Sequence, residues 1–143
     1  MPERMLTEPE GYGLLSACGI PVPPHQVVTS AGDARAAAGQ IGYPVVMKIV
    51  SSDIIHKSDV GGVVTAIESP EGVEEAFRTI MQNGAARAPE AAITGIIVEK
   101  QVPGGLEVLI GGKTDPSFGK VVTFGLGGKL VKLLEDISIR ALP

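Results

Sequence analysis

Apolar and polar stretches alternate along the chain at two different spacings. Short runs rich in β-branched residues, bounded by glycine, proline or polar residues, are typical of strands. They lie at residues 26–30, 43–51, 61–69, 93–102, 106–114 and 118–128. The run at 43–51 is apolar throughout its centre and predicts a buried strand.

The clearest helix is predicted at residues 69–88. Ser69 is a natural N-cap, and Pro70 suits the first turn of a helix. Apolar residues at helical spacing then form one stripe, which consists of Val73, Phe77, Ile80 and Met81. The segment therefore predicts an amphipathic helix.

Two shorter helices precede it in the chain. Residues 5–18 form a helical segment that Gly19 can terminate. Residues 30–42 are rich in alanine, and either Ser30 or Asp33 fits as their N-cap. Helices thus alternate with strands in the first part of the chain, and strands cluster later, which favours an α+β domain with a mixed sheet.

The last segment, residues 129–143, supports two interpretations. Leu130, Leu133 and Leu134 suit a helix, whereas Ile137 and Ile139 alternate as they would in a strand. The pattern alone does not choose between them.

Composition excludes several classes of protein. With 143 residues, 44% of them hydrophobic and 20% charged, the chain fits one ordinary globular domain. The net charge of −4 and the absence of Trp argue against a nucleic-acid surface. Cys18 is the one cysteine, so neither an internal disulfide nor a cysteine zinc site is possible. Charged residues near the N-terminus and the lack of a long apolar run favour neither a signal peptide nor a membrane span, and we expect a cytoplasmic protein without membrane partners.

The loop between the strands at 43–51 and 61–69 is unusually long and polar. It carries two aspartates, His56, Lys57 and the pair Gly61–Gly62, where a hairpin needs only about two to five residues. The backbone N–H groups of the glycine pair could close over phosphate oxygens, or the pair could simply form a turn.

Lys48 interrupts the buried strand that leads into this loop. An ammonium group among apolar neighbours is unfavourable unless it meets an anion or reaches water. Lys48 therefore either binds an anionic ligand or extends to solvent from the edge of the sheet.

A second polar stretch follows the strand at 93–102. An extended backbone at 99–102 offers the acceptor and the donor that an adenine requires, and Glu107 could bind ribose hydroxyls. The alternative is a pair of exposed glutamates beside a hairpin.

Two glycine-rich phosphate-binding motifs are excluded. Residues 111–114 (GGKT) end like a P-loop, but Glu107 stands where that motif requires its first glycine. Residues 125–130 (GLGGKL) fail the dinucleotide fingerprint because Leu130 stands in the place of its third glycine.

Four segments together resemble the ATP-grasp fold. More narrowly, they resemble the nucleotide-grasping domain of the NDP-forming (ADP-forming) acyl-CoA synthetases, which are related to succinyl-CoA synthetase. The segments are residues 14–24 (LLSACGIPVPP), 43–63 (YPVVMKIVSSDIIHKSDVGGV), 96–119 (IIVEKQVPGGLEVLIGGKTDPSFG) and 122–128 (VTFGLGG). The resemblance covers almost the whole chain and implies a first lobe at 1–92 and the start of a second lobe at 93–143. It also implies that the C-terminal part of the fold lies beyond this sequence.

The resemblance implies a site for ATP or ADP with Mg²⁺. Lys48 would contact the phosphates, and the loop around Gly61 and Gly62 would lie over them. Asp136 is the candidate magnesium ligand.

The same resemblance places the adenosine part of the nucleotide. The backbone of Lys100 and Val102 would hold the adenine, with Glu99 beside it. Glu107 would bind the ribose.

The implied function is that of an acid–thiol ligase of the ADP-forming acetate–CoA ligase type. It interconverts acyl-CoA, ADP and phosphate with carboxylic acid, CoA and ATP, through an acyl phosphate and a phosphohistidine. His56 is similar to a histidine that carries phosphate towards the nucleotide, and an imidazole is a competent nucleophile near neutral pH. It could equally serve only to order the loop.

The resemblance also implies a partner. A CoA-binding domain or subunit would supply the carboxylic acid and CoA, and the chain would be inactive without it and without the C-terminal segment. Two alternatives remain open, namely another ATP-grasp carboxylate ligase and a non-catalytic nucleotide-binding module of a fused acetyltransferase.

Overall fold

The computed structural model describes residues 5–128 and 137–142, which form two compact units, Met1–Val102 and Pro103–Pro143. This division falls later in the chain than the lobe boundary after residue 92 that the sequence suggested. The reason is that the strand at 95–100 pairs at the centre of the first unit's sheet.

The first unit is built on a four-stranded sheet in the order β1-β4-β2-β3. Its strands are β1 (His25–Val28), β2 (Val45–Val50), β3 (Val63–Ile67) and β4 (Gly95–Lys100). Each of the three pairings is antiparallel. The α+β architecture predicted from the sequence is confirmed.

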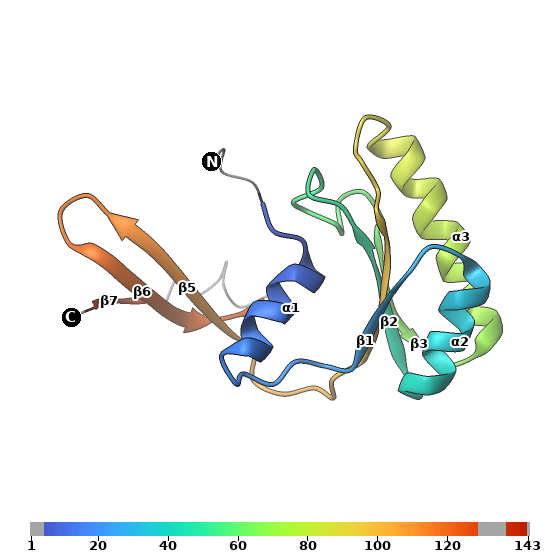
Figure 1. Ribbon diagram of the computed structural model, residues 1–143, viewed down its shortest axis with the longest axis horizontal. Coiled ribbons are helices and arrows are strands. Elements are labelled where there is room, and N and C mark those ends of the chain that lie inside the picture. Colours follow the sequence, from blue (N-terminus) through green and yellow to red (C-terminus); the bar gives the residue numbers. More distant parts are fainter. Residues whose placement is uncertain (1–4, 129–136, 143) are drawn as a thin grey trace. The chain divides into compact units, whose positions relative to one another are not determined.

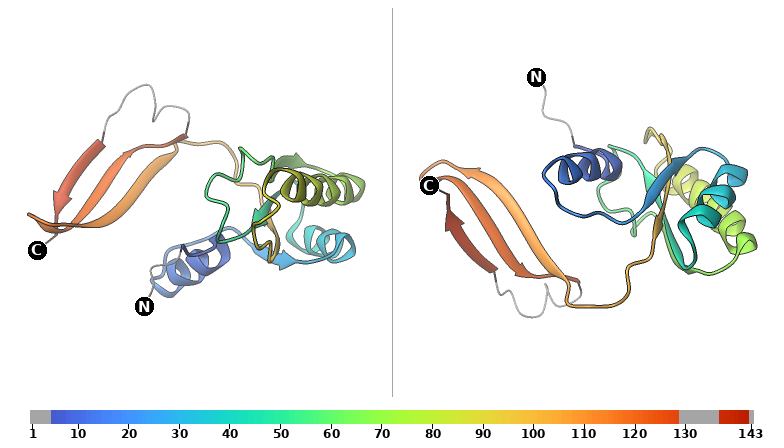
Figure 2. Two further views of the ribbon diagram at one scale, coloured as in Figure 1. Left: turned by 90° about the horizontal axis from the view of Figure 1, so that it is seen from above. Right: turned by 60° about the horizontal axis from the view of Figure 1, so that its bottom comes forward.

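Two helices cover one face of this sheet, α2 (Ala31–Ile41) and α3 (Pro70–Arg87), and they lie side by side (Figures 1 and 2). The core packs between them and the sheet, and includes Met47 and Ile49 of β2. Because side chains alternate along a strand, Lys48 lies on the opposite face of the sheet. Helix α1 (Glu8–Ala17) lies on that opposite face (Figure 1).

The helix caps agree with the sequence. The Ser69 hydroxyl accepts from the Gly72 N–H at 3.1 Å, and Ser30, rather than Asp33, caps α2. The predicted stripe of α3 is only partly right, because Met81 is exposed and Ala76 contributes to the buried face instead.

Helix α1 ends as predicted from Gly19. Gly19 takes a positive φ of 74°, and the Ile20 N–H reaches back to the Leu15 carbonyl at 2.9 Å. This is a Schellman-type stop, which satisfies carbonyls of the last turn.

The second unit contains a three-stranded antiparallel sheet in the order β5-β6-β7. The strands are β5 (Val108–Asp115), β6 (Gly119–Leu126) and β7 (Ile137–Ala141). Residues 137–141 are therefore strand, as one of the two interpretations held, and residues 129–136 lie outside the described part of the chain. Large apolar side chains are exposed on this unit, among them Ile110 and Phe118.

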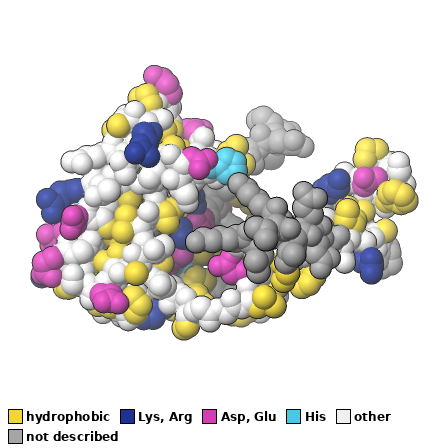
Figure 3. Space-filling view, turned by 180° about the vertical axis from the view of Figure 1, so that it is seen from behind, with side chains coloured by type: hydrophobic (Ala, Val, Ile, Leu, Met, Phe, Trp, Pro, Cys, Tyr) yellow, Lys and Arg dark blue, Asp and Glu magenta, His cyan; other side chains and the backbone are white. Residues whose placement is uncertain are grey.

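Acidic and basic side chains are interspersed on the face shown in Figure 3, in keeping with the net charge of −4. Within the described ranges, none of the helices has the length and apolar character that crossing a membrane requires.

Candidate functional site

Lys48 lies in a cluster of charged side chains on the sheet face opposite α2 and α3. Its Nζ is 2.5 Å from Oε1 of Glu99 and 2.7 Å from Oε1 of Glu8. Glu99 is on the neighbouring strand β4, and its side chain is only 7% exposed. The ammonium group of Lys48, which is half-buried, therefore contacts two carboxylates, and these satisfy its charge.

Helix α1 contributes two members of this cluster. Glu8 and Tyr12 are four residues apart and so share one face of the helix. The Tyr12 hydroxyl lies 3.0 Å from Oε1 of Glu8 and 3.0 Å from Oε2 of Glu99. The Tyr12 ring also packs at 4.8 Å, centroid to centroid, against His25, which is half-buried.

The polar loop contributes Lys57. Its Nζ donates to Oε2 of Glu8, the carboxylate oxygen that Lys48 does not contact. One carboxylate thus bridges two ammonium groups that are nine positions apart in the sequence. Charge-assisted hydrogen bonds of this kind are stronger than neutral ones.

The environment fixes the charges of these groups. Burial alone raises the pKa of the Glu8 carboxyl, but hydrogen bonds from Lys48 and Lys57 outweigh it and lower the pKa to about 2. Burial lowers the pKa of Lys48, and hydrogen bonds to Glu8 and Glu99 reverse this, so the net shift is upward. Burial and the two carboxylates raise the pKa of Tyr12. At neutral pH, Lys48 is therefore a cation, Glu8 an anion and Tyr12 a neutral donor.

The N–H groups of the predicted pair Gly61–Gly62 make hydrogen bonds within the loop. The Gly61 N–H donates to the Ser58 carbonyl at 3.0 Å, and the Gly62 N–H donates to the Lys57 carbonyl at 2.8 Å. A Cβ at Gly62 would lie 2.6 Å from Cγ2 of the buried Ile49. Close packing and turn geometry therefore account for both glycines, and a phosphate contact through these N–H groups would require the loop bonds to open.

His56 lies in the same loop and is exposed. Its backbone carbonyl accepts from the Asp59 N–H at 3.1 Å. Within the described ranges, its imidazole makes no hydrogen bond or ion pair. The ring nitrogens are thus accessible, as a phosphoryl acceptor requires.

Residues 99–102, at the end of β4 and just beyond it, form a segment that we call the hinge. Backbone contacts hold it in place. The Lys100 N–H donates to the Pro24 carbonyl at 2.9 Å, but proline has no N–H with which to return a hydrogen bond to the Lys100 carbonyl. The Lys100 ammonium holds the carbonyls of Gly42 and Tyr43 at 2.9 and 2.6 Å. Its side chain therefore anchors the hinge and leaves the backbone carbonyl available.

Val102 ends this hinge. It is 66% exposed, and among the described residues no backbone carbonyl accepts from its N–H. The preceding Gln101 is tied down at both ends, because its N–H donates to Pro44 and its side-chain carbonyl accepts from the Ala66 N–H at 2.6 Å. An accessible acceptor and an accessible donor thus follow Glu99 within three residues.

Two further predicted residues belong to the second part of the chain. Glu107 is exposed in the second unit, where its carbonyl accepts from the Gly127 N–H at 2.8 Å. Asp136, the candidate magnesium ligand, lies outside the described residues. Across residues 5–128 and 137–142, no group of three or more His, Cys, Asp or Glu could hold a metal ion.

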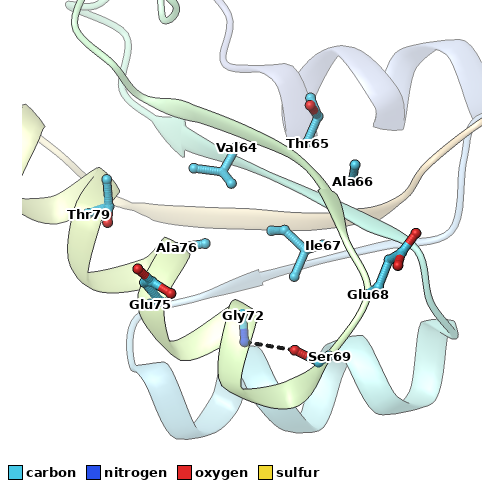
Figure 4. Close-up of a pocket in the computed structure, with 10 residues that line it drawn as sticks. All are labelled: Val64, Thr65, Ala66, Ile67, Glu68, Ser69, Gly72, Glu75, Ala76 and Thr79. Carbon is cyan, nitrogen blue, oxygen red and sulfur yellow. Dashed lines mark hydrogen bonds between the residues drawn. The ribbon is translucent and has the colours of Figure 1, made fainter.

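A groove of about 390 Å³ runs along β3 and the first turns of α3 (Figure 4). It shares no residue with the Lys48 cluster and carries two glutamates but no lysine or arginine. Its lining would repel phosphate, so it is not the site that the sequence predicted.

Sequence reasoning missed Glu8, Tyr12 and Lys57 as members of the site. A signal was present for the first two, because a carboxylate and a phenol at i and i+4 mark one polar face of a short helix. That face could not be matched to Lys48 without the fold.

Comparison with known proteins identifies relatives over nearly the whole chain. The ATP-grasp domain family model matches residues 2–143. The acetate–CoA ligase (ADP-forming) I subunit beta of Pyrococcus furiosus is 50% identical over 140 residues, which are 98% of this chain and 60% of that subunit. The chain therefore spans less than two thirds of this relative.

Solved structures of one protein are similar in fold and sequence. The dinucleotide-forming acetyl-coenzyme A synthetase 1 of Ca. Korarchaeum cryptofilum, in complex with coenzyme A and Ca-AMPCP, matches with a TM-score of 0.94 and 43% identity over 99% of this chain and 62% of its own. A second structure of it, with coenzyme A and Mg-AMPPCP, has its phosphohistidine segment pointing towards the nucleotide binding site. It matches with a TM-score of 0.78 and 40% identity over 99% of this chain and 59% of its own. With the family model covering residues 2–143, the chain belongs to the ATP-grasp domain family.

Proposed function

We propose that this chain is the nucleotide-binding part of an ADP-forming acyl-CoA synthetase. The observation that carries the proposal is the contact between Lys48 and Glu99 on one face of adjacent strands. It brings a cation suited to phosphate next to the carboxylate that begins the adenine-binding hinge. The relatives over this region, which are ADP-forming acetate–CoA ligase subunits, support the same assignment.

In this proposal the hinge binds adenine through its backbone. The Lys100 carbonyl accepts from the adenine amino group, because Pro24 has no N–H to occupy it. The Val102 N–H donates to a ring nitrogen. Glu99 lies beside the adenine, and Glu107 binds the ribose hydroxyls.

Phosphate binding falls to Lys48 and to the loop around Gly61 and Gly62. The ammonium group gives charge-assisted hydrogen bonds to phosphate oxygens. Magnesium would accompany the nucleotide, as it does the analogue in one of the related structures. Because the described residues contain no metal-binding cluster and Asp136 is not among them, we derive no step through the metal.

His56 is proposed to carry the phosphoryl group. A neutral ring nitrogen attacks the phosphorus of a phosphorylated donor on the CoA-binding partner, so a P–N bond forms as the donor's bond to phosphorus breaks. An oxygen of the ADP β-phosphate then attacks the same phosphorus, the P–N bond breaks and ATP forms. The exposure of His56 on its loop supports this assignment.

The partner is proposed to be a CoA-binding domain or subunit that supplies the carboxylic acid and CoA. One relative of this chain is called a beta subunit, and a longer ADP-forming acetate–CoA ligase of Archaeoglobus fulgidus matches over only 19% of its length. Both arrangements, a separate subunit and a fused domain, fit the proposal.

Calorimetric titration with Mg-ATP tests nucleotide binding. We expect Lys48→Ala and Glu107→Ala each to weaken affinity about ten-fold or more, because one charge-assisted hydrogen bond is worth about 1.5–3 kcal/mol. Lys113→Ala and Glu90→Ala are matched controls, since both residues are exposed and neither is among the residues proposed to bind the nucleotide. No binding by the folded chain, or equal losses in the controls, would contradict the site.

Phosphorylation of His56 tests the catalytic part. The chain has two histidines, so mass spectrometry under alkaline conditions distinguishes phosphate on His56 from phosphate on His25. We expect the label on His56 after incubation with the CoA-binding partner, acetyl-CoA and inorganic phosphate. Turnover that survives His56→Ala would instead favour a carboxylate ligase without a phosphohistidine.

A further inference from the structure

The Glu8 carboxylate occupies a position where two cations converge. One oxygen accepts from Lys48 at 2.7 Å and the other accepts from Lys57. The two lysines come from β2 and from the polar loop, whereas Glu8 comes from α1. Two converging ammonium groups that bracket one oxyanion are also what a phosphate group requires.

The helix that carries Glu8 contacts the sheet through several polar side chains. None of its own side chains is buried, and Leu14 is 58% exposed. Its contacts with the sheet include the Glu8–Lys48 ion pair, the Tyr12 hydroxyl bond to Glu99 and the Tyr12–His25 ring contact. Release of the Glu8 carboxylate therefore removes one of the charged contacts that hold the first turn of α1.

Charge counting shows that phosphate would replace Glu8 rather than join it. The formal charges of Lys48 and Lys57 cancel those of Glu8 and Glu99. A phosphate added to this neutral cluster would lie against two carboxylates, which is unfavourable in a partly buried site. When Glu8 leaves, the cluster carries one net positive charge and attracts an anion.

We propose that Lys48 and Lys57 form one anion subsite, which Glu8 occupies in this structure, and that nucleotide phosphates enter it by exchange with Glu8. This inference rests on the proposed function for the identity of the anion. Release of Glu8 frees the first turn of α1, so phosphate binding and the position of this helix are coupled. Lys57 becomes a second phosphate-binding side chain beside Lys48.

Glu8→Gln tests the exchange directly. The substitution removes the competing charge and leaves Lys48 paired with Glu99, so the fold keeps its buried ion pair. We expect Mg-ATP and pyrophosphate to bind this variant of the full chain about ten-fold more tightly than the wild type, which is about 1.4 kcal/mol. Adding Lys57→Ala to Glu8→Gln should remove most of the gain.

Glu74→Gln is the matched control. Glu74 also pairs with a basic side chain, Arg35 at 2.9 Å, but on the surface between α2 and α3. The Glu74→Gln variant loses the same charge without touching Lys48 or Lys57. Its affinity for Mg-ATP and pyrophosphate should equal that of the wild type, which separates local replacement of Glu8 from a change in net charge.

Hydrogen exchange of the α1 amides gives a second, independent measurement. In the wild type, Mg-ATP or pyrophosphate should accelerate exchange over residues 8–17, whereas in Glu8→Gln exchange should be fast already and change little. Tyr12→Phe loosens the helix but keeps the Glu8 charge, so it should raise exchange without the full gain in affinity.

The outcomes separate the two proposals. Tighter pyrophosphate binding by Glu8→Gln without any Mg-ATP binding would support the anion subsite and overturn the nucleotide function. If Glu8→Gln binds Mg-ATP equally well or more weakly than the wild type, the nucleotide function is supported and the replacement of Glu8 by phosphate is overturned. Amide hydrogen exchange in α1 that does not change on ligand binding would also overturn this replacement.

Discussion

The Glu8 carboxylate, which bridges Lys48 and Lys57, makes the stability of the first unit depend on pH in a definite direction. The pKa of Glu8 is about 2 in the folded chain, against an ordinary value of 4.5. A lowered folded-state pKa means that the unfolded chain binds protons more readily, so protonation favours unfolding. The stabilisation is therefore complete above about pH 4.5 and is lost as the pH falls through about 2.

The size of the effect follows from the same two values. A difference of about 2.5 units at about 1.36 kcal/mol per unit gives a ceiling of about 3 kcal/mol at pH 7. The side chain of Glu8 is 21% exposed, so solvent screening reduces this only modestly. About 2 kcal/mol of it should disappear between pH 7 and pH 3.

Urea denaturation of the wild type and of Glu8→Gln measures this contribution. The free energies of unfolding should differ by up to about 3 kcal/mol at pH 7 and by about 1 kcal/mol at pH 3. Glu74→Gln is the control, because its surface ion pair is worth less than about 1 kcal/mol. A difference between wild type and Glu8→Gln that stays constant from pH 7 to pH 3 would refute the assignment of this linkage to Glu8.

Two further predictions concern local packing and capping, and equilibrium unfolding measures both. Gly62→Ala should destabilise the chain by about 1–3 kcal/mol, because the added Cβ would press on the buried Ile49. Gly104 has open space around it, so Gly104→Ala should change stability by less than about 0.5 kcal/mol. Ser69→Ala should lower stability by about 1 kcal/mol through loss of the α3 cap, and Ser117→Ala, an exposed turn position, should be nearly neutral. Equal losses in a variant and its control would contradict the stated cause.

Several features were predictable because their causes are local in the chain. Ser69 caps α3 through the Gly72 N–H, and Gly19 stops α1 with a positive φ. Both depend only on neighbouring residues and on the backbone preferences of serine and glycine. The burial of Val73 and Ile80 likewise followed from helical spacing, whereas Met81 was misplaced because the width of the buried stripe depends on what packs against it.

The sequence indicated that Lys48 either binds an anion or extends to solvent, but it did not decide between the two or name a partner. The partners Glu8 and Glu99 are 40 and 51 positions away, and Tyr12 and Glu99 are 87 positions apart. Residues this far apart in the sequence come into contact only because β4 lies between β1 and β2 and α1 lies across the sheet. The local pattern gives no information about strand order.

The sequence by itself therefore determined the elements up to residue 128, the ATP-grasp resemblance and the residues whose chemistry is unusual for their position. Tertiary structure alone decided that the Lys100 carbonyl faces a proline and that Glu8 lies between two lysines. The physical reason is that hydrogen bonds and ion pairs act over about 3–4 Å, so their partners are fixed only when distant segments of the chain are packed together.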